Sequence, residues 1–555
     1  MNGAQAAVAA LEREGVDFIF GYPGGTIMPL YDALFQHAVR HVLCRHEAAA
    51  AFAAGGYARS SGRVGVCCAT SGPGATNLVT ALLDAYMDSV PVVAVTGQVR
   101  TELMGTDGFQ EADVCAITQA ITKRNFLVDD ASQIAPTLAA AFALARSGRP
   151  GPVLVDIPTD VLKAQAGELE AVAAPPSRSA VPRASDEAIR SAVARIRAAR
   201  RPVAIVGGGV RAGAVEAFRT FVSLLGLPHA STLMALGAAA PDDPHALGML
   251  GMHGLKAANK AVQRADLVLA LGMRFDDRVT GKPDRFARGA AVIHADIDAT
   301  EFNKIIPADV TLHGDLRETL EALVAELVRS PVPRFDDWAL EARALGGPLP
   351  SDRVDDRILS ATDVLDRFFA ALPADAIVTT DVGQHQMWAA QRARPAQPRR
   401  FITSSGLGAM GFGFPAAIGA QFANPGAPVF AIVGDGGFQM CLPELATLRR
   451  YGVPAKVLLI DNQNLGMVRQ WQELFFSARY SATNLADNPD FAAIARAYGI
   501  EAFSLSDPQH AAATIAAFID HAAPALLHAA CHPTENVWPM IPAGMTVDDL
   551  MEARA

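Results

Sequence analysis

Gly434-Asp-Gly-Gly437 follows the apolar run Ala431-Ile-Val433, and Asn462-Gln-Asn464 follows a second apolar run, Val457-Leu-Leu-Ile460. Short apolar runs bounded by turn residues predict buried strands. The glycines are expected to form the turn at the carboxyl end of the first strand, where the backbone can approach a phosphate without a Cβ in the way. Strands of this kind, alternating with helical segments, favour an α/β fold built on parallel sheets.

The two strand ends present one carboxylate, Asp435, and one amide, Asn462. Oxygen ligands of this kind hold Mg²⁺ beside a diphosphate group. Gly-Asp-Gly alone is an ordinary turn, but the pairing at this spacing resembles the diphosphate-binding motif of thiamine-diphosphate enzymes. That family usually has Asn where this chain has Asp461, and the residue that matches the metal ligand is Asn462. The resemblance also implies a backbone oxygen ligand at Asn464.

Composition is typical of a large cytoplasmic enzyme. The chain has 555 residues, of which 51% are hydrophobic and 19% charged. Its net charge of −10 argues against nucleic acid or an anionic membrane as the main partner. The six cysteines form no C-x-x-C pair, which argues against a zinc site or a disulfide framework. Residues 401–434 carry no charge, but their seven glycines and three prolines would break a membrane-spanning helix, so buried cofactor-site backbone is the better interpretation.

Three segments separate by composition, and we expect domains at residues 1–170, 185–330 and 358–545. A Pro/Ser/Ala-rich stretch around Pro175 and Pro176 reads as one linker, and residues 331–357 read as a second. Strand–helix alternation in all three segments predicts mainly parallel sheets flanked by helices. The first and third segments also share a faint repeat, a Ser-Gly-x-Gly turn followed by a helix-like run and an apolar strand, which hints at two related modules.

Further blocks along the chain identify the family. The chain resembles the catalytic subunit of acetohydroxyacid synthase (acetolactate synthase) over essentially its whole length. The matching blocks include Phe20-Gly-Tyr-Pro-Gly-Gly25, Arg45-His-Glu47, Thr70-Ser-Gly-Pro-Gly-Ala-Thr-Asn77, Gly105-Thr-Asp-Gly-Phe-Gln-Glu111, Arg274-Phe-Asp-Asp-Arg278 and Gly466-Met-Val-Arg-Gln-Trp471. In this family the three segments are the pyrimidine-binding domain, the FAD-binding domain and the diphosphate-binding domain.

Glu47 is the candidate for activating the cofactor. It precedes the apolar helix Ala48–Ala54, and a carboxyl group packed against alanines loses hydration, which favours its protonated form. Read alone, a Glu at a helix start is more often a surface acid that complements the helix dipole. The His-Glu context and the family resemblance favour the catalytic role, in which Glu47 hydrogen-bonds the pyrimidine ring.

The resemblance implies the remaining site residues. Its catalytic set is Glu47, Gly25, Phe109, Gln110, Arg278, Met410 and Trp471. Its thiamine-diphosphate set adds Pro73, Asn77, Val382, Gly383, Gln384, His385, Gly408, Gly434, Asp435, Gly436, Gly437, Asn462, Leu465, Gly466 and Met467. Met410 would prop the cofactor in its bent form, Arg278 would hold the carboxylate of the second ketoacid, and Trp471 would line the pocket for its alkyl group.

The middle segment is expected to hold FAD without a redox purpose. Gly207-Gly-Gly209 follows a predicted strand, but Ala212 stands where the dinucleotide fingerprint G-x-G-x-x-G needs its last glycine. The cofactor is therefore implied by the resemblance alone, through Arg149, Gly207, Gly208, Gly209, Thr232, Leu233, Met234, Leu250, Gly251, Met252, His253, Gly272, Arg274, Asp276, Arg278, Val279, Asp296, Ile297 and Asp315.

The implied reaction is decarboxylation of pyruvate on thiamine diphosphate and ligation of the two-carbon unit to pyruvate or 2-ketobutyrate. The products, 2-acetolactate and 2-aceto-2-hydroxybutyrate, would feed valine, leucine and isoleucine biosynthesis. The resemblance implies at least a homodimer, with a tetramer and a small regulatory subunit left open. The alternatives are a pyruvate oxidase, a catabolic acetolactate synthase without FAD, and a non-catalytic binding subunit. Arg274–Arg278 and Trp471 favour the anabolic carboligase.

Overall fold

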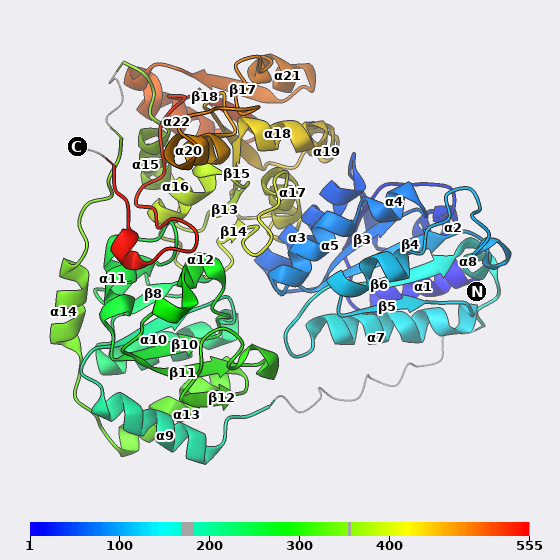
Figure 1. The fold of residues 1–555 in the computed structure, drawn as a ribbon. Helices are drawn as coiled ribbons and strands as arrows, with labels where there is room; N and C mark the ends of the chain where they lie inside the picture. The colour runs from blue at the N-terminus through cyan, green and yellow to red at the C-terminus, as the bar shows by residue number, and fades with distance from the viewer. Residues whose placement is uncertain (168–181, 353–356, 554–555) are drawn as a thin grey trace.

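Three parallel sheets of six strands each organise the molecule (Figure 1). The computed structural model describes residues 1–167, 182–352 and 357–553. Every pair of neighbouring strands in the three sheets is parallel, and the helices cover the sheet faces. The predicted three-domain α/β fold is therefore confirmed.

The first sheet has the strand order β2-β1-β3-β4-β6-β5. Its strands are β1 (Phe18–Gly21), β2 (Arg40–Leu43), β3 (Gly65–Ala69), β4 (Val92–Gln98), β5 (Arg124–Leu127) and β6 (Val153–Pro158). The helices around it are α1 (Gly3–Arg13), α2 (Met28–Leu34), α3 (Glu47–Ser61), α4 (Pro73–Thr76), α5 (Val79–Met87), α6 (Val114–Thr118), α7 (Ile134–Arg146) and α8 (Thr159–Lys163).

The middle sheet has the order β12-β11-β10-β7-β8-β9. Its strands are β7 (Pro202–Val206), β8 (His229–Ser231), β9 (Ala246–Met249), β10 (Leu267–Leu271), β11 (Ala291–Asp296) and β12 (Val310–His313). Its helices are α9 (Asp186–Ala198), α10 (Val215–Leu225), α11 (Lys256–Arg264), α12 (Asp277–Thr280), α13 (Leu316–Arg329) and α14 (Asp336–Ala344).

The third sheet has the order β14-β13-β15-β16-β18-β17. Its strands are β13 (Ile377–Thr380), β14 (Phe401–Thr403), β15 (Val429–Gly434), β16 (Lys456–Asp461), β17 (Glu501–Leu505) and β18 (Ala525–Ala530). Its helices are α15 (Ala361–Ala371), α16 (Gln384–Arg392), α17 (Gly413–Ala423), α18 (Asp435–Cys441), α19 (Leu445–Tyr451), α20 (Gly466–Phe475), α21 (Phe491–Ala497) and α22 (Ala511–Asp520). Counted within each domain, this strand order is the same as that of the first sheet, which supports the faint sequence repeat.

The two related domains meet through equivalent helices, α3 and α17, which lie side by side between their sheets (Figure 1). The crossing is close enough that only glycine fits at two positions. A Cβ at Gly56 would lie 2.1 Å from the carbonyl oxygen of Ala416, and one at Gly419 would lie 1.8 Å from that of Ala53. The backbones of the two helices are therefore in direct contact, and this contact sets the position of the first domain on the third.

Two local expectations differ from the structure. The Gly434–Gly437 stretch does not form a separate turn, because β15 ends at Gly434 and α18 begins at Asp435. The expected second linker contains α14, whose Trp338 and Ala342 are buried against the middle sheet, with the Trp338 indole donating to the carbonyl of Pro202 at 3.0 Å. The linker expected at Pro175 and Pro176 lies outside the described residues.

Within the part of the chain that the structure describes, no helix has the length and apolar character needed to cross a membrane. The uncharged stretch 401–434 instead forms β14, α17 and β15.

Candidate active site

A cavity of about 950 Å³ lies between the middle and third domains. It is open to loops at the carboxyl ends of strands in both sheets, where parallel α/β sheets bind ligands. The first domain contributes a few residues to its wall, Met87 to Ser89 after α5 and Arg149 after α7. The cavity is large enough for two cofactors of nucleotide size or for a cofactor and a substrate.

The third domain places every one of its expected thiamine-diphosphate residues on this cavity. They come from the loop after β13, the loop before α17, the start of α18 and the loop after β16: Val382, Gly383, Gln384, His385, Gly408, Met410, Gly434, Asp435, Gly436, Gly437, Asn462, Leu465, Gly466 and Met467. Asn464 and Trp471 line the same wall. Segments up to about 90 residues apart in sequence are brought together because β13, β15 and β16 are neighbours in the sheet.

The glycines of this wall make room for protein side chains as well as for a ligand. A Cβ at Gly434 would lie 2.8 Å from the ring of His385, and one at Gly437 would lie 2.7 Å from the carboxylate of Asp381. The start of α18 is therefore pressed against the loop after β13. This packing requires glycine at positions 434 and 437 whether or not a phosphate is bound.

His385 has an unpartnered ring nitrogen in this wall. It is buried, and its Nε2 has no hydrogen-bond partner among the described residues. Burial lowers the pKa of His385 to about 4, so the ring is neutral at physiological pH. A buried ring nitrogen without a partner is costly unless a ligand supplies one. The ring thus fits a phosphate oxygen of a bound diphosphate.

The candidate metal ligands lie at the base of the cavity. Asp435 is 2% exposed, and Nδ2 of Asn488 donates to its Oδ2 at 2.8 Å and to Oδ1 of Asp461 at 3.1 Å. Burial, together with the neighbouring Asp461 carboxylate, raises the pKa of Asp435 to about 7. Asp461 has a further partner in His528, whose Nε2 lies 2.8 Å from its Oδ2. A divalent cation at Asp435 would offset both the burial and the like charge, so the site fits Mg²⁺.

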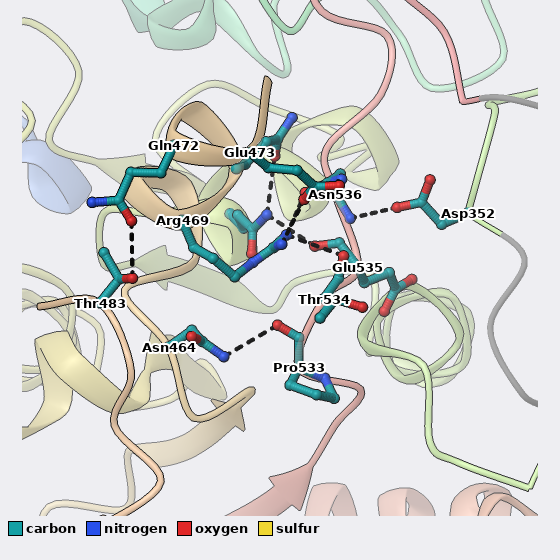
Figure 2. Close-up of polar contacts among 12 residues, drawn as sticks. Asp352, Asn464, Arg469, Gln472, Glu473, Thr483, Pro533, Thr534, Glu535 and Asn536 are labelled. Atoms are coloured by element: carbon teal, nitrogen blue, oxygen red, sulfur yellow. Dashed lines mark hydrogen bonds and ion pairs between the residues drawn. The ribbon is translucent and has the colours of Figure 1, made fainter. Parts of the chain in front are cut away.

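The amide ligand is held in one orientation. Nδ2 of Asn462 donates to Oε1 of Gln384 at 3.1 Å, and its Oδ1 accepts from the backbone N–H of Asn464 at 3.3 Å. The loop that carries it, residues 462–465, is the one that leads into α20. Figure 2 shows how this loop and α20 are both anchored to the carboxyl-terminal segment after β18.

Two side chains make that anchor. Nδ2 of Asn464 donates to the carbonyl of Pro533 at 3.2 Å, and Nη2 of the buried Arg469 donates to the carbonyl of Thr534 at 3.0 Å and to Oδ1 of Asn536 (Figure 2). Because Arg469 belongs to the second turn of α20, the helix cannot rotate without breaking these bonds. The direction of Trp471, on the same helix, is fixed in this way.

Trp471 lies on the cavity wall with its ring edge against Phe475, at a centroid distance of 5.8 Å. Its indole Nε1 is buried without a partner among the described residues. A buried indole usually finds an acceptor, so this N–H is left open toward the cavity side of the helix.

The middle domain supplies the other half of the cavity wall. Most of the expected FAD residues line it: Arg149, Gly208, Gly209, Thr232, Leu233, Met234, Leu250, Met252, His253, Gly272, Arg274, Asp276, Arg278, Val279, Asp296 and Ile297. Arg149 is held by the first domain and the middle domain together, through Ser89 at 2.8 Å and Glu301 at 2.8 Å. Arg278 keeps an exposed guanidinium. Its helix α12 is capped by Asp276, which accepts from the backbone N–H of Arg278 at 2.9 Å.

Three expected FAD residues lie off the cavity wall. Gly207 packs against Gly272, where a Cβ would lie 2.2 Å from the carbonyl oxygen. Gly251 exchanges two hydrogen bonds with the side chain of Asn259, both at 2.9 Å, and Asp315 caps the start of α13. All three shape the loops beneath the cavity rather than face it.

The expected site residues of the first domain lie elsewhere. Gly25, Glu47, Pro73, Asn77, Phe109 and Gln110 are all absent from the cavity wall. Oε2 of the buried Glu47 accepts from Nδ2 of Asn77 at 2.9 Å, at the start of α3. Phe109 is 88% exposed, and a Cβ at Gly25 would meet nothing within 4 Å. Within one chain, the expected first-domain residues therefore lie apart from the cavity.

Sequence reasoning missed several cavity residues. Asp88, Arg211, Ser404 and Ser405 line the wall but were not expected there. Ser405 belongs to the Ser-Gly-Leu-Gly repeat already noted, and Arg211 follows the Gly207–Gly209 turn by two residues, so both had a nearby signal. Asp88 had none, because a single Asp after a helix is usually a solvated cap.

Family comparisons agree with this architecture. The amino-terminal binding domain, central domain and carboxyl-terminal binding domain of thiamine pyrophosphate enzymes match residues 1–117, 189–323 and 381–529 respectively.

Curated relatives match over the full chain. The chain is 50% identical to the acetolactate synthase isozyme 2 large subunit of Escherichia coli (strain K12), over 100% of both proteins. It is 48% identical to an acetolactate synthase of Mycobacterium bovis and 45% identical to an acetolactate synthase large subunit of Corynebacterium glutamicum, covering 100% of this chain and 92% and 90% of those proteins. The three domains, the cavity between them and these matches establish that the chain belongs to the acetolactate synthase large-subunit family of thiamine-diphosphate enzymes.

Proposed function

We propose that this protein decarboxylates pyruvate and ligates the two-carbon unit to a second 2-ketoacid, pyruvate or 2-ketobutyrate, in branched-chain amino acid biosynthesis. The observation that carries the proposal is the third-domain wall, where a buried unpaired His385 and a buried Asp435 with a raised pKa face one cavity together with Trp471. These groups suit a diphosphate, a divalent cation and an apolar substrate chain in that order.

Thiamine diphosphate, when bound, would supply the electron sink for loss of CO₂. Nε2 of His385 would face a phosphate oxygen and donate to it when the ring carries a proton there, and Asp435 with Asn462 and the backbone of Asn464 would hold Mg²⁺ against the same group. Met410 would support the cofactor from below. Its Cε lies 3.6 Å from the position of a Cβ on Gly436, so it already packs on the diphosphate wall.

Glu47 would hold a proton at a ring nitrogen of the cofactor's pyrimidine. Asn77 orients the Glu47 carboxyl, since its Nδ2 donates to Oε2 and leaves Oε1 for the ligand. Gly74 keeps that approach open, because a Cβ there would lie 3.3 Å from Oε1. Gln110, Phe109 and Gly25 would border the reacting carbons.

The separation of the half-sites supports a homodimer in which each cavity is completed by the partner's first domain. The surface around each half-site carries exposed apolar side chains, Met28 and Phe109 on the first domain and Met440, Val468 and Phe476 on the third. Exposed apolar groups of this size mark surfaces that another protein covers. Sedimentation of the purified protein should give at least a dimer.

FAD would occupy the middle-domain part of the cavity as a structural element, because the ligation is redox-neutral. Arg149, Arg274 and the Gly208–Gly209 turn would hold it. Arg278, with an exposed guanidinium on the shared wall, would bind the carboxylate of the second ketoacid in a bidentate manner.

Product analysis tests the proposal. The purified protein, given pyruvate with and without 2-ketobutyrate, should form both acetohydroxyacids, and each of thiamine diphosphate, Mg²⁺ and FAD should be omitted in turn. Oxygen consumption in step with turnover would favour a pyruvate oxidase, full activity without FAD would favour the catabolic enzyme, and absence of CO₂ release would indicate a non-catalytic subunit.

Four further features belong to the proposal. The domain boundaries at 1–170, 185–330 and 358–545 enclose the three sheets. A small regulatory subunit is a proposed partner, since several relatives are named as large subunits. Tetramer formation and a cytoplasmic location are further predictions, for which sedimentation and cell fractionation are the measurements.

A further inference from the structure

Three buried charged residues of the first domain form one cluster beside the cavity. Nη2 of Arg59, on α3, lies 2.8 Å from Oδ2 of Asp84 on α5 and 2.9 Å from Oδ2 of Asp88, the C-cap residue that follows α5. The three side chains are 6%, 1% and 2% exposed. The guanidinium also lies over the ring of Phe412 in the third domain, 4.7 Å from its centroid.

Both carboxylates reach across to the third domain. Oδ2 of Asp88 accepts from the backbone N–H of Ser405 at 3.0 Å, and its Oδ1 accepts from that of Gly406 at 2.7 Å. Oδ1 of Asp84 accepts from the hydroxyl of Ser404 at 2.5 Å. That hydroxyl in turn accepts from the backbone N–H of Ala409 at 2.8 Å. The cluster therefore fixes residues 404–409 at both ends.

This segment contains Gly408 and is followed directly by Met410, and both residues lie on the cavity wall. We define residues 404–411 as the Met410 loop. Its far end is held from within its own domain, because the carboxylate of Asp381 accepts from the backbone N–H of Gly411 at 3.0 Å and of Gly413 at 3.1 Å. The Met410 loop thus has two carboxylate anchors, Asp381 in the third domain and Asp88, with its partners, in the first.

Stability alone is a weak reason for burying this cluster. Taking one guanidinium and two carboxylates out of water is costly, and apolar side chains of similar volume are often as stable in such places. Backbone N–H groups of a loop, in contrast, can be fixed in position only by acceptors, and an ionised carboxylate is among the strongest.

We infer that Asp88, which shares the Arg59 guanidinium with Asp84, is a positioning residue that lets the first domain set the Met410 loop against the cofactor. The inference rests on the proposed function, because Met410 acts only if thiamine diphosphate is bound there. Asp88 itself acts through the loop and not on the substrate. Through this cluster, the relative position of the first and third domains, which meet at α3 and α17, affects the position of the Met410 loop.

Asp88→Asn is the first test, measured in the full-length protein with saturating thiamine diphosphate, Mg²⁺ and FAD. A displacement of the loop by about 1 Å should lower kcat by about 10- to 100-fold, with a smaller change in KM for pyruvate. Hydrogen exchange measured by mass spectrometry should speed up in peptides covering residues 404–411 and stay unchanged in peptides covering β3 and β4. Asp88→Glu, which keeps the charge, should restore part of the activity.

Tyr451→Phe is the matched control. It removes two other hydrogen bonds between the same two domains, because the Tyr451 hydroxyl accepts from the backbone N–H of Leu43 at 2.8 Å and donates to the carbonyl of His41 at 3.3 Å. It does not touch the Met410 loop. Its kcat should stay within about twofold of the parent.

If Asp88→Asn does not fold, Ser404→Ala is the second test variant. It removes only the hydroxyl that joins the Asp84 carboxylate to the backbone N–H of Ala409. If the variant keeps the parental kcat and the parental rate of hydrogen exchange in the Met410 loop, the inference is wrong. The proposed acetolactate synthesis would not be affected by that result. A parent protein that forms no acetolactate would instead overturn the proposed function.

Discussion

Mg²⁺ binding should depend on pH through a single buried carboxylate. Burial, and then the Asp461 carboxylate, raises the pKa of Asp435 to about 7, so that near neutrality the metal-free protein carries a proton there for roughly half of the time. Mg²⁺ needs the ionised form, and the two therefore compete for the same oxygen. Lowering the pH should weaken Mg²⁺ binding.

The magnitude follows from the ionised fraction. With a pKa of about 7, Asp435 is ionised to roughly one part in eleven at pH 6 and ten parts in eleven at pH 8. The apparent dissociation constant for Mg²⁺ should then rise by about tenfold from pH 8 to pH 6. The direction of the pH dependence follows from the raised pKa of Asp435. Mg²⁺ affinity is greatest at pH values above this pKa and decreases as the pH falls through it.

The same carboxyl group has the opposite effect on the metal-free protein. Its pKa is raised above the unfolded value, so the folded state binds the proton more tightly and gains stability as the pH falls from about 8 toward 5. Mg²⁺ removes this trend by holding Asp435 ionised. Thermal unfolding with and without Mg²⁺ and thiamine diphosphate should therefore show its largest difference at the high end of this range.

Calorimetric titration of Mg²⁺ in the presence of thiamine diphosphate, at pH 6, 7 and 8, is the assay. The diphosphate group titrates in the same range, so Asp435→Asn is needed as the control. The variant should bind Mg²⁺ weakly, and whatever pH dependence it keeps belongs to the cofactor. If the parent and the variant show the same tenfold trend, or if the parent shows none, Asp435 does not exchange a proton for the metal and the assignment fails.

Three further predictions concern the other parts of the site. Glu47→Gln should slow hydrogen–deuterium exchange at C2 of the bound thiamine ring with the fold intact, and an unchanged rate measured by NMR would remove Glu47 from that role. Activity should persist when FAD is replaced by a 5-deazaflavin analogue, and its loss would show that the flavin exchanges electrons. Trp471→Leu should lower the preference for 2-ketobutyrate over pyruvate by roughly 10- to 100-fold, because one methylene in an apolar pocket contributes about 1–3 kcal/mol; a parental ratio of the two products in competition would make Trp471 ordinary packing.

The strands that decide the fold could be predicted from the sequence, because each is a short, continuous run of apolar residues that ends at turn residues. The runs before Gly434 and Asn462 became β15 and β16. Local patterns of this kind depend on neighbouring residues only. The third-domain wall was predictable for the same reason, since its residues follow directly from strand ends that parallel pairing brings to one edge.

Expectations failed where distant packing decides the conformation. Glycines usually indicate a turn, but Gly434 ends β15 and α18 begins at the next residue, where Asp381 after β13 and His385 on α16 pack closely against the glycines. The Pro-, Asp- and Arg-rich composition of residues 331–357 hid α14, although Trp338 and Ala342, four residues apart, would share one helical face. The cluster of Arg59, Asp84 and Asp88 left no signal, because charged residues on helices are usually solvated.

The proposed division of the site between two chains would give α3 an unusual position. Glu47 begins this helix and Arg59 lies near its end, twelve residues later, which corresponds to about 18 Å along the axis. In the proposed dimer, Glu47 would reach the cofactor held by the partner, while Arg59 and Asp88 set the Met410 loop of the chain's own third domain. One rigid helix would then contact two cofactor sites, one at each end. At the close crossing of α3 with α17, Gly56 and Gly419 leave no room for a Cβ. Because the two helices are packed so tightly, a shift of α3 toward one cofactor site would also change its position at the other site.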